Sequence, residues 1–280
     1  MPTPMLGRSK NVLLILLNVM AIVVICCLSG VAAMACNSHR HKENKGRTRA
    51  VHASLAEVSP PDWTLRAVIV DSLYQTMKDV HDVLTYTGVG YAIDSGTLLG
   101  AVRNKGLIPN DDDLDIRVSS EDRALLVETA FRRLHKLGYE TCECFFGYKV
   151  FPENGKVFHD ADLKYKFPAL DIFMTTMDGG RTETQHDKWP SCYFTDTEFF
   201  LTKMYGFGPL RLFGPASTKD YFDRCYGTDW NEFTYTTYDH STETYLGEGS
   251  KVALTEEGRR PSLPSKPLRQ SKYSNRLQTE

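Results

Sequence analysis

Aspartates concentrate in one short run of the sequence, IPNDDDLDIR, which covers residues 108–117. Side chains alternate between the two faces of a strand, so Asp113 and Asp115 share a face if residues 114–118 form a strand. Two adjacent carboxylates repel each other, and a divalent cation offsets this repulsion most economically. Ligands that are all oxygen atoms favour Mg²⁺ or Mn²⁺ over zinc. The run therefore predicts a metal site at Asp113 and Asp115, with a solvated acidic turn as the alternative.

Other aspartates could extend this site. Asp171 lies in the apolar segment ALDIF, where a charge is costly unless it is paired or metal-bound. We interpret it as a third metal ligand, with a salt-bridged strand residue as the alternative. Asp111 and Asp112 precede the strand and would be outer residues of the site or solvated. Asp94 lies at the end of another short strand, where caps are common.

A segment that could bind phosphate stands shortly upstream, in DSGTLLGAVR (94–103). Gly96 allows the backbone to turn tightly, and free N–H groups in a first helical turn can hold a phosphate. Ser95 and Thr97 add hydroxyl groups. Arg103 could pair with a phosphate through its planar guanidinium group. The alternative for Gly96 is a purely structural turn glycine.

The elements that must position these residues follow from hydrophobic periodicity and from capping residues. Asp62 can cap the first helix, and Gly88 can end it. An Asn-Gly turn at 152–156 predicts a hairpin. We expect helices at 62–87, 96–104 and 120–137, and strands at 91–94, 114–118, 139–151, 156–159 and 168–176, followed by further strands and a helix near 217–227. This order predicts a small α/β or α+β domain with a mixed sheet.

The cysteines and one histidine of the predicted domain give less indication of function than the aspartates do. Its four cysteines could form up to two disulfides or stay reduced; they are Cys142, Cys144, Cys192 and Cys225. No cysteine cluster has zinc-ligand spacing. His81 falls on the polar side of the first helix, so we expect it to be solvated.

The flanks of the predicted domain differ from it in composition. Residues 12–35 carry no charge and span roughly 36 Å as a helix, enough to cross a bilayer. We expect a tail at 1–10, a transmembrane signal-anchor at 11–36 and a stalk at 37–61, with a cleaved signal peptide as the alternative to the anchor. The catalytic domain would cover 62–246. Residues 247–280 hold few large apolar residues and predict a disordered tail.

A long stretch of the sequence resembles the signature of the LicD family, which includes fukutin and fukutin-related protein. The stretch is YAIDSGTLLGAVRNKGLIPNDDDLDI, and LDIF (170–173) and YGTDW (226–230) add to the likeness, which covers roughly residues 62–233. Two positions depart from the family pattern. Members commonly have Trp where Asn110 stands and often have His where Asn104 stands, so donor or acceptor preference could differ.

The resemblance implies a nucleotidyltransferase-like fold and a phosphotransferase activity. Family members move a phospho-alcohol, such as phosphocholine or ribitol 5-phosphate, from a CDP-linked donor onto a glycan or glycoprotein. By motif, Asp113 and Asp115 would hold Mg²⁺, and Asp171 would bind the metal or act as a general base. Ser95, Gly96, Thr97 and Arg103 would bind the donor phosphates.

Two other functions compete with this one. A membrane-anchored glycosyltransferase also uses an Asp-x-Asp metal site, but its fold generally needs a longer nucleotide-binding unit before the motif. A catalytically silent glycan-binding relative would be marked by lost acidic residues, and all three are present. The formal net charge of −2 gives no indication of nucleic-acid binding.

Two signals conflict on the membrane orientation. Basic residues after the span outnumber those before it, which predicts a cytosolic domain. The family resemblance and the order of anchor, stalk and domain instead favour a type II protein of the Golgi or endoplasmic reticulum. We expect the domain in the lumen.

Overall fold

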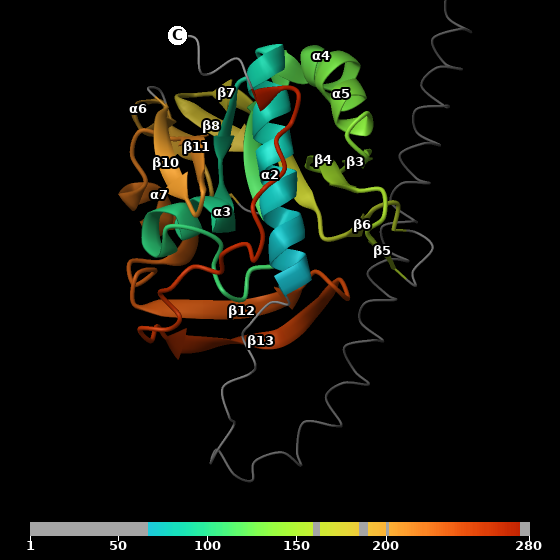
Figure 1. The fold of residues 1–280 in the computed structure, drawn as a ribbon. Helices are drawn as coiled ribbons and strands as arrows, with labels where there is room; N and C mark the ends of the chain where they lie inside the picture. Colours follow the sequence, from blue (N-terminus) through green and yellow to red (C-terminus); the bar gives the residue numbers. More distant parts are fainter. Residues whose placement is uncertain (1–66, 159–162, 185–189, 200–201, 275–280) are drawn as a thin grey trace, which may run out of the picture. The chain divides into compact units, whose positions relative to one another are not determined.

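The computed structural model describes residues 67–274 except for 159–162, 185–189 and 200–201 (Figure 1). The described residues belong to one compact unit, Asp62–Glu280. The predicted N-terminal tail, membrane anchor and stalk, and the predicted cap Asp62, lie outside the described residues. No helix in the described part of the chain is long and apolar enough to cross a membrane.

A mixed sheet forms the centre of the unit and confirms the predicted α/β class. Its strands follow the order β1-β2-β7-β4-β3, and β8 and β9 continue from β7. Strands β2 and β7 are parallel, whereas β1 on β2, β4 on β7 and β3 on β4 are antiparallel. The bounds are β1 Tyr91–Ile93, β2 Leu114–Ser119, β3 Tyr139–Cys144, β4 Gly147–Pro152, β7 Leu170–Asp178, β8 Arg181–Thr184 and β9 Phe194–Thr195.

The helices lie where the periodicity predicts them. Helix α2 ends at Thr87, directly before Gly88, whose φ of +80° suits glycine. The second predicted helix is α3 with the π-helical turn η2, and Ser119 caps the third. The bounds are α2 Ala67–Thr87, α3 Ser95–Leu99, η2 Gly100–Asn104, η3 Ser120–Asp122, α4 Arg123–Leu125, η4 Leu126–Ala130, α5 Phe131–His135, α6 Asp196–Phe199 and α7 Lys219–Tyr226.

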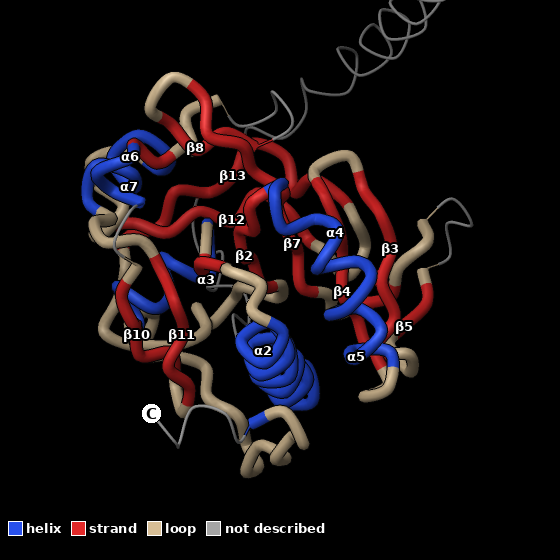
Figure 2. Tube along the Cα trace, turned by 90° about the horizontal axis from the view of Figure 1, so that it is seen from above, coloured by secondary structure: helices blue, strands red, loops and turns tan. Residues whose placement is uncertain are grey.

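The two faces of the sheet have different roles, because side chains alternate along each strand. Leu114 and Ile116 of β2 and Leu170 and Ile172 of β7 are fully buried in the hydrophobic core, together with apolar residues of α2. The alternate residues of the same strands, including Asp115 and Asp171, turn to the other face. Figure 2 shows α2 and the β12–β13 hairpin on opposite sides of β2 and β7.

The prediction of one long strand over 139–151 is wrong. The chain reverses at Phe145 and Phe146, so that β3 and β4 form a hairpin with Cys144 opposite Gly147. A Cβ atom at Gly147 would lie 2.2 Å from the carbonyl oxygen of Ile172, and its φ is +146°. This close approach needs glycine and fixes the start of β4.

The predicted Asn-Gly hairpin at 152–156 is also wrong. Strand β5 (Lys156–Val157) does not return along β4 but pairs with β6 (Lys166–Phe167). The turn itself exists, because the N–H of Gly155 donates to the carbonyl oxygen of Pro152. Strands β4 and β5, on either side of the turn, do not pair with each other, so they do not form a hairpin.

The C-terminal region is more ordered than the predicted disordered tail from residue 247. Two hairpins follow the central sheet: β10 (Lys203–Phe207) with β11 (Leu210–Gly214), and β12 (Phe233–Asp239) with β13 (Thr244–Ala253). The chain then runs along α2, where Asp71 accepts hydrogen bonds from Ser265 and Gln75 accepts one from the N–H of Arg269. This attachment needs few apolar residues, which is why composition did not reveal it.

His81 is likewise not solvated as expected. It is 8% exposed, and its Nδ1 lies 2.6 Å from the hydroxyl of Tyr91. Burial lowers the pKa of His81. Strand β1 and Phe213 of β11 cover this side of α2 with aromatic rings, which a view of the helix alone cannot show.

Candidate active site

The parallel pairing of β2 and β7 brings the three predicted carboxylates together. Asp115 stands directly opposite Asp171, and Asp113 lies two residues before Asp115 on the same face. One ligand oxygen from each lies within 4.8 Å of the others. Asp113, Asp115 and Asp171 are 9%, 7% and 6% exposed, and they line a cavity of about 320 Å³.

Without a bound cation, the cavity strongly disfavours the charged form of its carboxylates. Burial, and then the charges of Asp113 and Asp171, raise the pKa of Asp115 well above its ordinary value. Burial and the charge of Asp113 do the same to the pKa of Asp111, which lines the cavity as well. Such repulsion among buried carboxylates is relieved by protons or by a cation.

Asp171 is both a member of the carboxylate cluster and part of an ion pair. Lys149 stands opposite it on β4, and its Nζ lies 2.7 and 2.8 Å from the two carboxylate oxygens. Both side chains are 9% exposed. Burial alone would lower the pKa of Lys149. The charge and the hydrogen bonds of Asp171, together with the charge of Asp113, outweigh burial, so that the pKa is raised and the lysine stays charged.

Sequence reasoning missed His240, as it also missed Lys149. His240 lies just after β12, lines the cavity, and places Nδ1 2.7 Å from Asp112 Oδ1 and Nε2 3.1 Å from Asp113 Oδ2. Burial disfavours its charged form, but Asp113 and Asp112 outweigh burial and raise the pKa of His240 to about 10. No local pattern could have revealed a contact between residues 128 positions apart.

The segment predicted to bind phosphate supports the aspartates directly. The N–H of Gly96 donates to Asp115 Oδ2 (3.1 Å), and the Oγ1 of Thr97 accepts from the N–H of Asp115 (2.8 Å). A Cβ atom at Gly96 would lie 2.5 Å from Asp111 Oδ2, so only glycine leaves room for that carboxylate. Ser95 lines the cavity with a φ of +43°.

Arg103 is placed differently from Ser95, Gly96 and Thr97. Its NH1 group donates to the carbonyl oxygens of Trp230 (2.9 Å) and Phe233 (3.3 Å). It therefore joins the end of η2 to the beginning of β12. The described residues that line the cavity do not include it.

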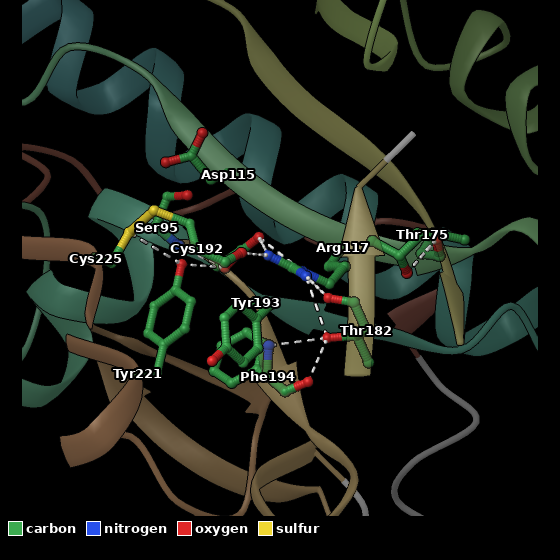
Figure 3. A network of polar contacts seen from close by, with 12 residues as sticks. Ser95, Asp115, Arg117, Thr175, Thr182, Cys192, Tyr193, Phe194, Tyr221 and Cys225 are labelled. Carbon is green, nitrogen blue, oxygen red and sulfur yellow. Dashed lines mark hydrogen bonds and ion pairs between the residues drawn. A yellow bond between two sulfur atoms is a disulfide. The ribbon is translucent and has the colours of Figure 1, made fainter. Parts of the chain in front are cut away.

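The wall of the cavity next to Asp115 is built around a buried ion pair (Figure 3). Arg117 NH2 lies 2.7 Å from Asp94 Oδ2, and both side chains are 1% exposed. Arg117 also donates to Thr182 and to the carbonyl oxygen of Cys192, while Tyr221 donates to Asp94. Both carboxylate oxygens of Asp94 therefore accept hydrogen bonds from the protein itself.

A disulfide between Cys192 and Cys225 closes the same wall. The two other cysteines of the domain, Cys142 and Cys144, are free thiols on β3 with their sulfur atoms 3.8 Å apart. Of the pairings that the sequence left open, the structure thus has one disulfide.

The residues fit a divalent cation that prefers oxygen. Asp113, Asp115 and Asp171 offer carboxylate oxygens from a buried site, and Asp112, Asp113 and His240 form a second group with comparable spacing. One further oxygen, Oδ2 of Asp111, is buried and accepts no hydrogen bond from any described residue. Mg²⁺ and Mn²⁺ suit such ligands, and either would offset the repulsion described above.

Comparison with known proteins identifies the class to which this fold and site belong. Residues 88–217 match the family model described as LicD/FKTN/FKRP, nucleotidyltransferase domain. The chain belongs to the LicD family, as the motifs around the aspartates indicated.

Three individual proteins are similar to this chain, and one of them carries the name LicD. An uncharacterized protein of Rickettsia prowazekii is 33% identical over 70% of this chain and 71% of its own length. One of Rickettsia typhi is 31% identical over 71% of this chain and 60% of its own length. The lipopolysaccharide cholinephosphotransferase LicD of Haemophilus influenzae is 38% identical over 56 residues, which are 20% of this chain and 21% of that protein.

Proposed function

We propose that this chain is a metal-dependent phosphotransferase. It would move a phospho-alcohol, of the ribitol 5-phosphate or phosphocholine type, from a CDP-linked donor onto a glycan or glycoprotein. The observation that carries the proposal is the cluster of Asp113, Asp115 and Asp171 in one cavity. Membership of a family with a cholinephosphotransferase of lipopolysaccharide supports the transfer of a phospho-alcohol.

The chain would supply a charged and rigid frame for this reaction. Asp113 and Asp115 would hold Mg²⁺ or Mn²⁺, which when bound neutralises charge on the diphosphate and on the departing CMP. An acceptor hydroxyl would attack the phosphorus that carries the alcohol, and the bond from that phosphorus to CMP would break. Asp171 would bind the metal or take the proton of the acceptor hydroxyl. Most of the acceleration would come from positioning and fixed charges.

The frame is well suited to this role because its parts are already fixed. The N–H groups of Gly96 and Asp115 are committed to hydrogen bonds within the site, and Lys149 holds Asp171 through both of its oxygens. Carboxylates held in this way need little reorganisation when a substrate arrives. The donor phosphates would approach from the cavity side, where Ser95 and Gly96 form part of the lining.

The decisive experiment is a transfer assay with the full chain purified in detergent. CDP-ribitol, CDP-choline and CDP-glycerol, and nucleotide sugars as the rival donors, are each offered with a panel of glycans, with Mn²⁺ or with EDTA. We expect CMP release and acceptor labelling from a CDP-alcohol only in the presence of metal. Transfer from a nucleotide sugar alone would favour the glycosyltransferase, and no binding of Mn²⁺ or donor would favour a silent glycan-binding relative.

A matched pair of variants on one strand tests the site itself. Asp171→Asn changes a buried member of the cluster, whereas Asp178→Asn changes an exposed aspartate further along β7. We expect the first to lose transfer and the second to keep it. Equal activity of both variants would remove the argument from the carboxylate cluster.

We also propose that the domain works in the lumen of the Golgi or endoplasmic reticulum, anchored by an N-terminal membrane helix. The disulfide between Cys192 and Cys225 supports an oxidising compartment, since such bonds are rare in the cytosol. Protease protection of tagged microsomes tests the orientation. A C-terminal tag that is digested in intact microsomes would place the domain in the cytosol.

A further inference from the structure

Three described residues that line the cavity, Cys225, Tyr226 and His240, come from outside the segment that matches the family model, and His240 forms ion pairs with its aspartates. Residues 88–217 match that model, whereas His240 lies beyond them, between β12 and β13. Its imidazole reaches both Asp112 and Asp113, with nitrogen–oxygen distances of 2.7 and 3.1 Å. The side chain of His240 is 27% exposed, so it forms part of the lining and is not sealed in the core.

The turn that carries His240 is itself fixed. Oδ1 of Asp239 accepts the N–H of Ser241 at 2.8 Å, which closes the turn locally. Lys156 donates to the carbonyl oxygen of Ser241 at 3.0 Å, which ties the turn to β5. Arg103 fastens the other end of β12 through the carbonyl oxygen of Phe233. The imidazole is therefore presented to the aspartates by an anchored hairpin.

Asp113 is the residue for which this contact matters most. It is the one carboxylate common to both groups of candidate metal ligands, one with Asp115 and Asp171 and one with Asp112 and His240. A carboxylate turns easily about its last bond, and the ion pair between His240 Nε2 and Asp113 Oδ2, at 3.1 Å, restricts that rotation. Groups that orient metal ligands in this way contribute strongly to metal affinity.

We infer that His240 is a positioning residue of the active site, which orients the Asp113 carboxylate for the metal and the donor phosphates. The inference deepens the proposed function and rests on it for the identity of the donor. It makes the β12–β13 hairpin part of the catalytic unit. If His240 had only a structural role, its replacement would lower the stability of the hairpin and leave metal binding unchanged.

The test measures Mn²⁺ binding by calorimetry on the full chain, with no substrate present, for His240→Ala and His240→Gln. We expect the Mn²⁺ dissociation constant of His240→Ala to rise by about 10- to 100-fold, as is typical when a partner of a metal ligand is removed. An amide N–H of Gln can still donate to one carboxylate, so His240→Gln should fall between this variant and the natural protein. His135→Ala is the matched control, because His135 contacts Thr141 at an exposed position.

Transfer kinetics then separate this inference from the proposed function. At saturating Mn²⁺ we expect the kcat of His240→Ala to recover in part, since excess metal compensates for weaker binding. Unchanged or tighter Mn²⁺ binding by a folded His240→Ala variant would overturn the positioning role. Weaker Mn²⁺ binding in a chain that transfers no phospho-alcohol would leave the positioning role intact and remove the proposed function.

Discussion

Asp115 on β2 and Asp171 on β7 face each other across two parallel strands, in register and on the same side of the sheet. Lys149 on β4 continues the row from Asp171. The row places two carboxylates and one ammonium group where the opposite sides of the same strands form the hydrophobic core. Buried charge at this position is costly unless it is paired, and Lys149 pairs with Asp171 whereas Asp115 has no such cationic partner among the described residues.

Asp115→Asn should strongly reduce transfer and also stabilise the protein when metal is removed. The Asn side chain keeps an oxygen that can accept the N–H of Gly96. It removes the carboxylate, whose charged form is disfavoured by burial, as the raised pKa of Asp115 shows. We expect activity to fall on the order of 10²–10³-fold and unfolding free energy in EDTA to rise by about 0.5–2 kcal/mol. Thermal melts in EDTA and the transfer assay check both. A less stable variant in EDTA would show that the charge is satisfied by the protein alone.

Lys149→Met should destabilise the fold strongly, because it leaves Asp171 buried without its partner. Removing one member of a buried pair costs about 3–5 kcal/mol, and we expect the double variant Lys149→Met with Asp171→Asn to recover most of this. Lys166→Met is the matched control, since its partner Glu140 is 48% exposed and such surface pairs contribute about 0–1 kcal/mol. Urea unfolding of the natural protein, Lys149→Met, Asp171→Asn and the double variant measures the coupling, with Lys166→Met measured beside them. Additive losses from the two single variants would contradict the coupling.

Much of this site was predictable from sequence because its geometry is local or periodic. The alternation of LDIRV and LDIF predicts which faces Asp115 and Asp171 occupy, and parallel pairing of the two strands then brings them together. His240 was not predictable, because its contact depends on how two hairpins and a sheet pack. The turn at Phe145 was missed for a related reason, since the need for glycine at 147 arises from the backbone of β7.

The stability of the protein in EDTA should decrease as the pH rises. Asp111 and Asp115 have pKa values raised in the fold, so their contribution is present below the ordinary aspartate value near 4 and is lost as the pH rises through the folded values. His240 adds a second decrease between pH 6.5 and about 10, where the folded protein retains a proton that the unfolded chain releases. Melting curves from pH 5 to pH 10 measure both. The second decrease should be absent from His240→Gln, and its persistence would assign it to another group.

The disulfide should contribute to stability and should be detectable by mass spectrometry. Cys192 and Cys225 are separated by 33 residues, and a disulfide that closes such a loop contributes about 2–4 kcal/mol. We expect Cys192→Ser with Cys225→Ser to lose this amount, while Cys142→Ser with Cys144→Ser changes stability little, since those two are free thiols. Non-reducing peptide mapping should find the first pair joined and the second pair open to alkylation. Alkylation of all four without reductant would contradict the pairing.

Arg103 offers the sharpest distinction between a role in phosphate binding and a role in structure. Its position in the motif predicts a donor-phosphate contact, whereas its NH1 group donates to Trp230 and Phe233, where β12 begins. We therefore expect Arg103→Met to lower the unfolding free energy by about 1–3 kcal/mol, because two carbonyl oxygens lose a charged donor. It should lower kcat through the loosened His240 and change the KM for the donor little. Arg132→Met, at an exposed position on α5, is the control. An increased donor KM with unchanged stability would instead assign Arg103 to the donor phosphates, which would then have to reach it from outside the cavity described above.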